Sequence, residues 1–400
     1  MASNLPILIA GGGIGGLAAA LALSRNGFKV QVLERSRAFG EIGAGVQLGP
    51  NAFNAFDRLG VGDAARGIAV YVDRLRMMDA LTAEEIAHIP LEESFRKRFG
   101  NPYAVVHRGE MHGVLFNACQ ADPNIELSVS SEVVDYDQDG ATVAAALSNG
   151  EVVRGSALIG ADGLWSKVRA KLAADGPPRV SGHSSYRSVI PVEAMPEDLR
   201  WNAATLWAGP HCHIVHYPLS GWKVFNLVCT YHSDAPEVVA GQPVTKEEVG
   251  EGFQHVHPMA RQIISHGSDW KLWVTCDRDP ITKWTDGRVV LLGDAAHPML
   301  QYFAQGACMA LEDAVQLGDS VADFPGDLAA AFEDYNLRRV NRTTRVQLQS
   351  RELGKHVYHP EGAHAVLRNA VMQAKSAEDW YETLGWLYDG GNAAASASRA

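Results

Sequence analysis

The sequence predicts an α/β protein in which a nucleotide-binding domain is interleaved with a second, β-rich domain. Three observations lead to this fold class: a strand, glycine-rich turn and helix at the amino terminus, a β-rich aromatic stretch at 179–284, and a second strand, loop and helix at 289–314. The chain has 400 residues, of which 46% are hydrophobic, so it can bury a large core. We therefore expect two interlocked domains rather than one.

The amino-terminal segment predicts a βαβ unit. Pro6–Ala10 is typical of a buried strand, Gly15–Asn26 of a helix, and Lys29–Glu34 of a second strand. The turn between the first strand and the helix carries a GxGxxG pattern, formed by Gly11, Gly13 and Gly16, with Ile14 and Gly15 between the last two.

A turn of this kind binds the pyrophosphate of a dinucleotide, because glycines allow close backbone approach and the helix N–H groups face the phosphate charge. Glu34 ends the next strand 23 residues after Gly11, where a carboxylate can accept hydrogen bonds from both ribose hydroxyls of an adenosine. Arg35 has two interpretations, as a solvated strand-end residue or as a residue over the adenine. A second GxGxxG is absent, which disfavours enzymes that bind flavin and nicotinamide on two separate Rossmann domains.

The middle and the end of the chain alternate between predicted helices and strands. The glycine-rich segment 41–51 predicts a loop. The other predicted elements are a helix at 52–59, strands within 70–89, a helix at 107–121, strands at 126–143 and 151–159 around a turn at Asn149-Gly150, helices at 329–354 and 363–373, and a frayed tail at 392–400. These elements predict a nucleotide-binding domain at 1–75, 101–178 and 286–345, a substrate domain at 76–100 and 179–285, and a C-terminal helical segment and tail at 346–400.

The bulk composition excludes several partners. The net charge of -11 disfavours nucleic acid or an anionic membrane as the main partner, because both need a basic face. The five cysteines form no CxxC pair, which argues against flavin disulfide reductases and fits reduced thiols in the cytoplasm. The apolar amino terminus lacks a basic region and is interrupted by glycines, so we interpret it as folded structure rather than a signal peptide, and no other stretch is long enough to span a bilayer.

Two further predicted strands end in an aspartate beside a glycine. One ends at Asp162-Gly163, where the carboxylate could equally cap the following helix. The other ends at Gly293-Asp294 and is followed by a loop and by a helix that begins near Gly306. Free N–H groups at such a helix start suit an anionic or polar ligand. One long ligand could therefore be held by both the amino-terminal turn and this second site.

The order of these motifs, together with HRGEMHGVL around Arg108, resembles the single-component FAD-dependent aromatic hydroxylases. The likeness covers residues from about 5 to 345. It implies the para-hydroxybenzoate hydroxylase fold, in which a Rossmann-like FAD-binding domain is interleaved with a β-rich substrate domain and followed by C-terminal helices. It also implies that Asp294 contacts the ribityl and pyrophosphate region of FAD, that Arg108 contacts the flavin, and that the Asp162 motif supports both FAD and NAD(P)H. The cofactor residues we expect are Gly11, Gly13, Ile14, Gly15, Gly16, Glu34, Arg35, Gln47, Arg108, Asp162, Asp294, Gly306 and Ala307.

Within that family, three segments are similar to bacterial hydroxylases of 3-hydroxybenzoate: EIGAGVQLGPNA at 41–52, GPHCHIVHYPL at 209–219 and GDAAHPMLQYFAQGA at 293–307. The resemblance implies that O2 and reduced FAD form a flavin C4a-hydroperoxide, which hydroxylates the ring para to its hydroxyl to give gentisate. It favours NADH over NADPH as the reductant. It also makes a homodimer an alternative to a monomer.

His213 is expected to act as the base that removes the phenol proton, since a phenolate is the better nucleophile and histidine suits base catalysis near neutral pH. If the segment is a strand, His211, His213, Val215 and Tyr217 share one face. From the pattern alone a strand histidine is more often a packed core residue, and only the resemblance assigns the catalytic role. The resemblance likewise makes Gln301 a partner of the substrate hydroxyl and Tyr217 a polar support.

Other candidate residues keep two interpretations. His297 has structural and functional interpretations of nearly equal weight. His107 and His112 have no third ligand at a useful spacing, so no metal is expected. The residue that binds the substrate carboxylate stays open among Arg187, Gln47 and Tyr103.

Several alternative functions remain beside this hypothesis. Salicylate 1-hydroxylase, which decarboxylates its substrate, and 6-hydroxynicotinate 3-monooxygenase share much of the same frame. The second usually carries a histidine where Gln47 stands and lacks a glutamine at Gln301, so both glutamines count against it. A non-enzymatic nucleotide-binding scaffold, as in GDP-dissociation inhibitors, shares the first glycine motif but need not keep the two aspartate motifs. A flavin-dependent halogenase is disfavoured because its WxWxIP motif is missing.

Overall fold

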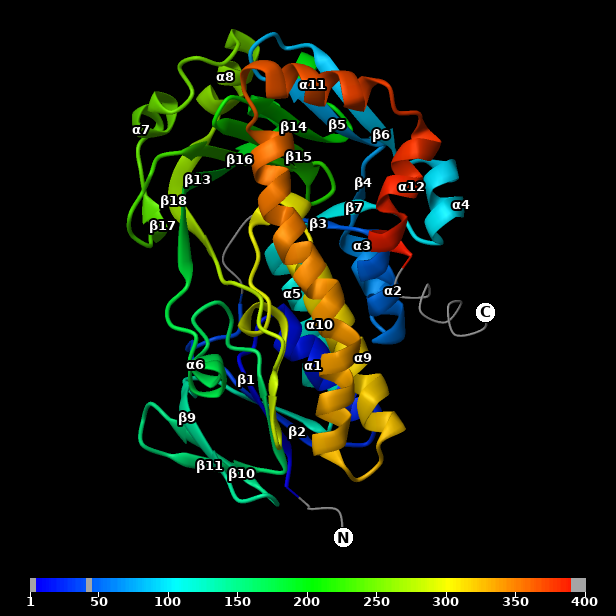
Figure 1. The fold of residues 1–400 in the computed structure, drawn as a ribbon, viewed down its shortest axis with the longest axis vertical. Coiled ribbons are helices and arrows are strands. Elements are labelled where there is room, and N and C mark those ends of the chain that lie inside the picture. The colour runs from blue at the N-terminus through cyan, green and yellow to red at the C-terminus, as the bar shows by residue number, and fades with distance from the viewer. Residues whose placement is uncertain (1–4, 41–44, 390–400) are drawn as a thin grey trace.

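The computed structural model describes residues 5–40 and 45–389. Figure 1 shows an elongated molecule with one sheet in its lower part, a larger sheet in its upper part, and helix α10 (Leu328–Leu353) running along both. The predicted tail at 392–400 and the first residues of the loop predicted at 41–51 lie outside the described ranges. No helix within those ranges has the length and apolar character needed to cross a membrane.

The predicted βαβ unit lies at the centre of a six-stranded sheet. β1 (Ile7–Ala10) pairs in parallel with β2 (Val30–Leu33) on one side and with β12 (Ala157–Gly160) on the other. The sheet continues to β8 (Ile125–Ser128) at one edge, and to β20 (Val289–Leu291) and β19 (Thr285–Asp286) at the other. All residues of β1 are buried, as expected for a central strand of a parallel sheet. The carboxyl ends of β1, β12 and β20 meet at one edge of this sheet.

Two helices begin at that edge and pack against each other. α1 (Ile14–Arg25) follows β1, and α9 (Gly306–Asp323) follows β20. Small residues permit the close contact, since a Cβ added at Gly318 of α9 would lie 3.3 Å from the Cβ of Ala22 in α1. α5 (Arg108–Ala121) also packs on α1.

The strands predicted at 126–143 and 151–159 are interrupted by turns. Beyond β8 they form an antiparallel sheet of β9 (Val133–Gln138), β10 (Val143–Leu147) and β11 (Val152–Gly155) before the chain re-enters the main sheet as β12. The predicted Asn149-Gly150 turn joins β10 to β11, with Gly150 at φ 88°. α6 (Lys167–Ala173) follows β12 and packs on β9.

The predicted β-rich stretch forms most of an eight-stranded sheet, with the order β17-β18-β13-β16-β15-β14-β5-β6. Neighbouring strands are antiparallel except for β14 and β5, which are parallel. The strands are β5 (Arg74–Asp79), β6 (Glu85–Pro90), β13 (Arg179–Pro191), β14 (Ala203–Gly209), β15 (Cys212–Leu219), β16 (Val224–His232), β17 (Ala240–Pro243) and β18 (Ser268–Asp277). The short helices α7 (Lys246–Glu251) and α8 (Pro258–Ser265) share a hydrophobic core with this sheet.

A small sheet and the C-terminal helices connect these parts. β3 (Gly45–Leu48) lies in the segment predicted as a loop, and it is a strand because it pairs with β7 (Ala104–His107), far along the chain. β4 (Val70–Tyr71) completes that sheet. α2 (Pro50–Arg58) contacts β3, and α3 (Gly62–Ile68) packs on α2 and α5, while α4 (Glu93–Phe99) follows β6 in the chain. α10 continues into a π-helical turn at Gly354–Tyr358, after which α11 (Gly362–Gln373) contacts β6 and α12 (Ala377–Tyr388) contacts α4.

Candidate active site

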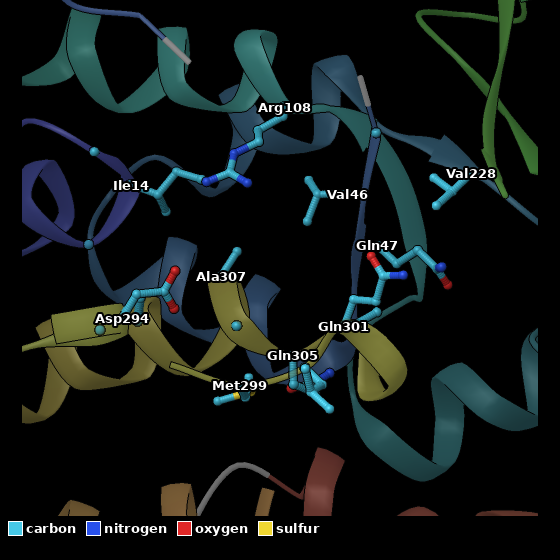
Figure 2. A pocket seen from close by; sticks show the side chains of 18 of the residues that line it. Ile14, Val46, Gln47, Arg108, Val228, Asp294, Met299, Gln301, Gln305 and Ala307 are labelled. Carbon is cyan, nitrogen blue, oxygen red and sulfur yellow. The ribbon is translucent and has the colours of Figure 1, made fainter. Parts of the chain in front are cut away.

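A cavity of about 410 Å³ lies between the two main sheets. Its lining comes from the turn after β1, from β3, from β15 and β16, and from the loop between β20 and α9. Figure 2 shows Ile14 and Asp294 at one end of the cavity and Gln47 and Gln301 at the other. Motifs predicted for the cofactor and residues predicted for the substrate therefore face a common space.

The glycine turn shapes the first end of the cavity. Gly11 has φ 105°, and a Cβ there would collide with the carbonyl oxygen of Ala161, while a Cβ at Gly16 would collide with that of Gly11. These two glycines do not line the cavity, but they let α1 start close to the sheet. Gly13, Ile14 and Gly15 do line it.

Two helix amino termini face the cavity without side-chain caps. α1 begins after Gly13 and α9 begins after Gln305, and neither residue forms a capping hydrogen bond with its side chain. Gly306 and Ala307, both predicted cofactor residues, open α9 along the cavity wall. The first N–H groups of a helix lack partners within the helix, so both starts can receive an anionic or polar ligand.

Glu34 is fixed beside the glycine turn rather than in the cavity. Its carboxylate accepts hydrogen bonds from the backbone N–H of Gly12 at 2.7 Å and of Ser36 at 2.8 Å. Burial opposes ionisation, but the backbone donors, the Ser36 side chain and nearby Arg35 together hold the pKa of Glu34 below its ordinary value. Arg35 next to it is exposed.

The two predicted aspartates have different surroundings. Asp162 accepts hydrogen bonds from Ser166 Oγ at 2.5 Å and from the backbone N–H of Lys167 at 2.7 Å, so its carboxylate supports the start of α6, whose N-cap residue is Ser166. Its neighbours Ala161 and Gly163 line the cavity, whereas Asp162 does not. Asp294 does line the cavity, and its carboxylate has no hydrogen-bond partner among the side chains and backbone that the structure describes.

These features fit FAD. The Gly13–Gly15 turn and the start of α9 supply N–H donors for a pyrophosphate, and the available Asp294 carboxylate can accept from the hydroxyls of a ribityl chain. Arg108 and Val46 line the cavity between that end and the opposite end. Gln47, predicted as a cofactor residue, also lines it, and its Oε1 accepts from the Tyr103 hydroxyl at 2.6 Å.

The opposite wall is built by β15. His213, Val215 and Tyr217 all line the cavity, as the strand alternation predicted. His211 was expected on the same face, but it precedes the strand with φ 54° and is exposed, so that expectation is wrong. Burial raises the pKa of the Tyr217 hydroxyl.

Gln301 and Arg187 lie beside this wall. Gln301 donates from Nε2 to Thr230 Oγ1 at 3.0 Å and accepts from an Arg187 Nη at 3.4 Å. Arg187 lines the cavity, lies 5.1 Å from the Trp273 ring centroid, and forms no ion pair with a carboxylate in the described ranges. Burial, together with nearby Arg108, lowers the pKa of Arg187. An anionic ligand beside Arg187 would raise this pKa again, because it stabilises the charged guanidinium.

His213 is neutral near pH 7. Burial, reinforced by His183 and His232, lowers its pKa to about 3. Its Nδ1 lies 2.6 Å from Nε2 of His359, which directs Nε2 of His213 to other partners. A neutral imidazole can accept a proton, but one with so low a pKa holds it weakly.

Three histidines have structural partners. His297 is fully buried with Nε2 2.5 Å from Asp313 Oδ2, which favours its structural interpretation. His107 accepts from the backbone N–H of Gly109 at the start of α5, and His112 bonds the Gly12 carbonyl oxygen at 2.8 Å. His107 and His112 therefore serve separate contacts.

Sequence reasoning missed the contribution of the C-terminal segment. Tyr358 lines the cavity, and His359 contacts His213, but only helical periodicity marked this region. His359 also lies near His183 and His232, and ring nitrogens of these three lie within 4.8 Å of one another. A single sequence offers no signal that these distant residues meet.

Comparison with known proteins places the chain among flavin-binding proteins. Residues 4–346 match the family model described as FAD binding domain. The chain is 53% identical to 3-hydroxybenzoate 6-hydroxylase 1 of Aquipseudomonas alcaligenes, covering 96% of this chain and 97% of the relative. It is 50% identical to 3-hydroxybenzoate 6-hydroxylase of Polaromonas naphthalenivorans, covering 96% of each. A solved salicylate hydroxylase substrate complex has a TM-score of 0.80 and 26% identity, covering 96% of this chain and 95% of that one.

Proposed function

Because this chain belongs to the FAD-binding family of class A flavoprotein monooxygenases, we propose that it hydroxylates 3-hydroxybenzoate para to the hydroxyl group, giving gentisate. The observation that carries this conclusion is the cavity wall formed by His213 and Arg187. His213 is a neutral histidine, and Arg187 has no carboxylate partner among the residues that the structure describes. Both face the space bordered by the residues proposed to bind FAD. A phenol needs the first group and a carboxylate needs the second.

The described residues have separable tasks. Nε2 of His213 accepts the proton of the substrate hydroxyl, and the Gln301 amide, fixed by Thr230, bonds the same oxygen. Tyr217 supports this polar wall from the same strand face. FAD, when bound and reduced by a nicotinamide, supplies the activated oxygen. With the hydroxyl held at His213, the ring carbon para to it points away from this wall, toward the flavin side.

Arg187 is the carboxylate anchor in this proposal. Of the three candidates, Arg187 is the one that carries a charge. Tyr103 is buried and donates its hydroxyl proton to Gln47 Oε1, so that proton is already engaged. NADH is the proposed reductant, a homodimer is the proposed assembly, and five unpaired cysteines support a reducing cytoplasmic location.

A panel of hydroxybenzoates tests the proposal. The FAD-loaded protein is mixed with NADH and 2-, 3- or 4-hydroxybenzoate or 6-hydroxynicotinate, and NADH oxidation, oxygen uptake and products are measured together. 3-Hydroxybenzoate should give gentisate in step with oxygen uptake. Efficient conversion of salicylate to catechol, or of 6-hydroxynicotinate, would contradict the proposal. A colourless protein that gains no flavin would instead favour a nucleotide-binding scaffold.

A further inference from the structure

Four histidines connect the active-site cavity to the protein surface, and we propose that they form a proton relay that carries the substrate's phenolic proton to solvent. The relay runs from His213 through His359 and His232 to His211. This inference rests on the proposed function, because it requires a phenol at His213.

The ring nitrogens make an unbroken series of contacts. His213 Nδ1 lies 2.6 Å from His359 Nε2, and His359 Nδ1 lies 2.8 Å from His232 Nε2. His232 Nδ1 lies 3.3 Å from His211 Nδ1. Exposure rises along the series: His213 is 1% exposed and His359 4%, whereas the side chain of His211 is 58% exposed and reaches Glu361 at 3.2 Å.

Three different elements place these rings. His213 lies on β15, and His232 ends the adjacent strand β16, so antiparallel pairing brings His232 opposite the residue that precedes β15. The backbone N–H of His232 donates to the carbonyl oxygen of His211 at 2.9 Å, which confirms that alignment. His359 follows the π-helical turn and is inserted between the rings of His213 and His232.

Aromatic side chains enclose the inner half of the series. The Tyr358 ring is perpendicular to His213, with centroids 5.0 Å apart, and the Tyr302 ring lies 5.5 Å from His359. Because these rings pack around His213 and His359, the contact between the two imidazoles is the direct polar connection from His213 toward the surface. Without such a path, the proton would remain on a buried imidazole beside the substrate.

The transfer balances when His213, His359 and His232 begin as Nδ1–H tautomers and His211 begins as the Nε2–H tautomer, so that its Nδ1 can accept from His232. The phenol O–H bond breaks as His213 Nε2 gains the proton, and His213 Nδ1 gives its own proton to His359 Nε2. His359 Nδ1 then gives its proton to His232 Nε2, and His232 Nδ1 gives one to His211 Nδ1. The exposed His211 passes its Nε2 proton to water or to Glu361. When the hydroxylated carbon loses its hydrogen and the ring becomes aromatic again, the phenol oxygen regains a proton, and reverse transfer restores the tautomers.

The lowered pKa values of these histidines favour passing a proton along the series over holding it on one ring. Burial lowers the pKa of His213 to about 3, and it also lowers the pKa values of His359 and His232, so each ring carries one proton near pH 7 and can accept a second. Other titratable groups face these rings. His183 stacks on His232 and bonds the Tyr302 hydroxyl, and Tyr358 packs on His213. The charged groups are Asp234 near His232, Arg179 near His183 and Glu361 at His211.

A metal site is the competing use of this cluster, because His183, His232 and His359 place ring nitrogens within 4.8 Å of one another. The contacts of 2.6 and 2.8 Å on both nitrogens of His359 favour hydrogen bonding. Elemental analysis of the purified active enzyme, before and after treatment with a chelator, separates the two. A stoichiometric ion whose removal abolishes hydroxylation would overturn the relay.

The main test compares single turnovers of FAD-loaded wild type with His359→Gln and with His364→Gln, an exposed control outside the series. Glutamine can still hydrogen-bond His213 and keep its orientation, but it does not relay a proton. His359→Gln should slow gentisate formation about ten-fold or more and release peroxide, while flavin reduction by NADH and the Kd for 3-hydroxybenzoate change less than about two-fold. The control should match wild type. An unchanged rate in His359→Gln would mean that His359 only positions His213, and would overturn the relay.

Chemical rescue gives an independent measurement. In His359→Ala, added imidazole should restore at least about half of the lost rate, since it can occupy the vacated space and exchange a proton. If His359→Ala binds FAD but is inactive and imidazole does not restore its rate, the result counts against the relay. If His359→Ala fails to fold, the single-turnover rate of His359→Gln decides between the two outcomes. Wild type that forms no gentisate would overturn the proposed function along with the relay; wild type that forms it while both variants keep full rate would overturn the relay alone.

Discussion

His213 and His359 are 146 residues apart in the chain, yet their ring nitrogens lie 2.6 Å apart. One belongs to the strand that forms the proposed substrate wall of the cavity, and the other belongs to the C-terminal segment. The contact fixes the orientation of His213 and leaves its Nε2 available to a substrate. The chemistry of this wall therefore depends on the C-terminal segment as well as on the sheet.

Replacing His213 should separate cofactor binding from hydroxylation. His213→Ala should keep FAD but lose about 10²–10⁴-fold in gentisate formation, because the phenol loses its base, and the consumed oxygen should appear as peroxide. His216→Phe is the matched control, since His216 is also buried on β15 but does not line the cavity. Oxygen uptake, product and peroxide are measured together. Full coupling in His213→Ala would remove His213 from the role of base.

Replacing Arg187 should reveal what binds the carboxylate. Arg187→Met should raise the KM for 3-hydroxybenzoate by about 30-fold or more, corresponding to about 2 kcal/mol for a charge-assisted pair. The binding of 3-hydroxybenzyl alcohol, which has no carboxylate, should change little. Titration of both compounds into the FAD-loaded variants measures the difference. Equal weakening of both compounds would show that Arg187 supports the wall rather than the carboxylate.

The two aspartates should behave differently when truncated. Asp294→Ala should weaken FAD binding about ten-fold, because it removes an acceptor that faces the cavity. Asp162→Ala should instead lower the free energy of unfolding of the apo protein by about 1 kcal/mol, because it removes the acceptor of the Lys167 N–H at the start of α6 and of the hydroxyl of the N-cap Ser166. Flavin titration and urea unfolding of both variants check the contrast. A large loss of FAD affinity with unchanged apo stability in Asp162→Ala would contradict the capping role.

Acid should destabilise the protein through its buried histidines. Burial, with Arg76 nearby, lowers the pKa of His216 to about 3 from 6.5. The unfolded chain therefore takes up the proton first, and the contribution of His216 to stability falls as pH drops from about 6.5 toward about 3. Between about pH 7 and 5 this loss is about 2 kcal/mol for one such group.

His216→Phe isolates that contribution. Its unfolding free energy should depend less on pH than that of wild type, by about 2 kcal/mol over the same interval. At pH 7 it should be at least as stable, because neither ring nitrogen of His216 has a hydrogen-bond partner in the described structure. Urea unfolding at both pH values provides the comparison. Equal pH dependence in the two proteins would mean that His216 titrates normally.

Local patterns predicted the cofactor side of the molecule well. The fold class is confirmed, and the glycine turn and the start of α9 lie where the sequence placed them, because a strand, turn and helix are encoded by neighbouring residues. The role of Asp162 could not be resolved, since helix capping and ligand binding use the same residue at the same position. β3 was missed because its pairing with β7 depends on residues distant in the chain.

The substrate side was only partly predictable. Strand alternation placed His213, Val215 and Tyr217 on one face, but it also included His211, whose backbone leaves the extended conformation in the turn before β15. The contacts of His359 depend on how the segment after α10 folds back over the sheet, and periodicity carries no information about such packing. The assignment of base and hydroxyl partner came from family resemblance.

The most direct measurement of the central claim is one turnover of the FAD-loaded, NADH-reduced enzyme with 3-hydroxybenzoate under ¹⁸O₂, followed by chromatography and mass spectrometry of the product. The structure and the family together predict gentisate carrying one ¹⁸O atom on the carbon para to the original hydroxyl. Formation of 2,3- or 3,4-dihydroxybenzoate, or release of peroxide without a hydroxylated product, would contradict the proposed orientation of the phenol at His213.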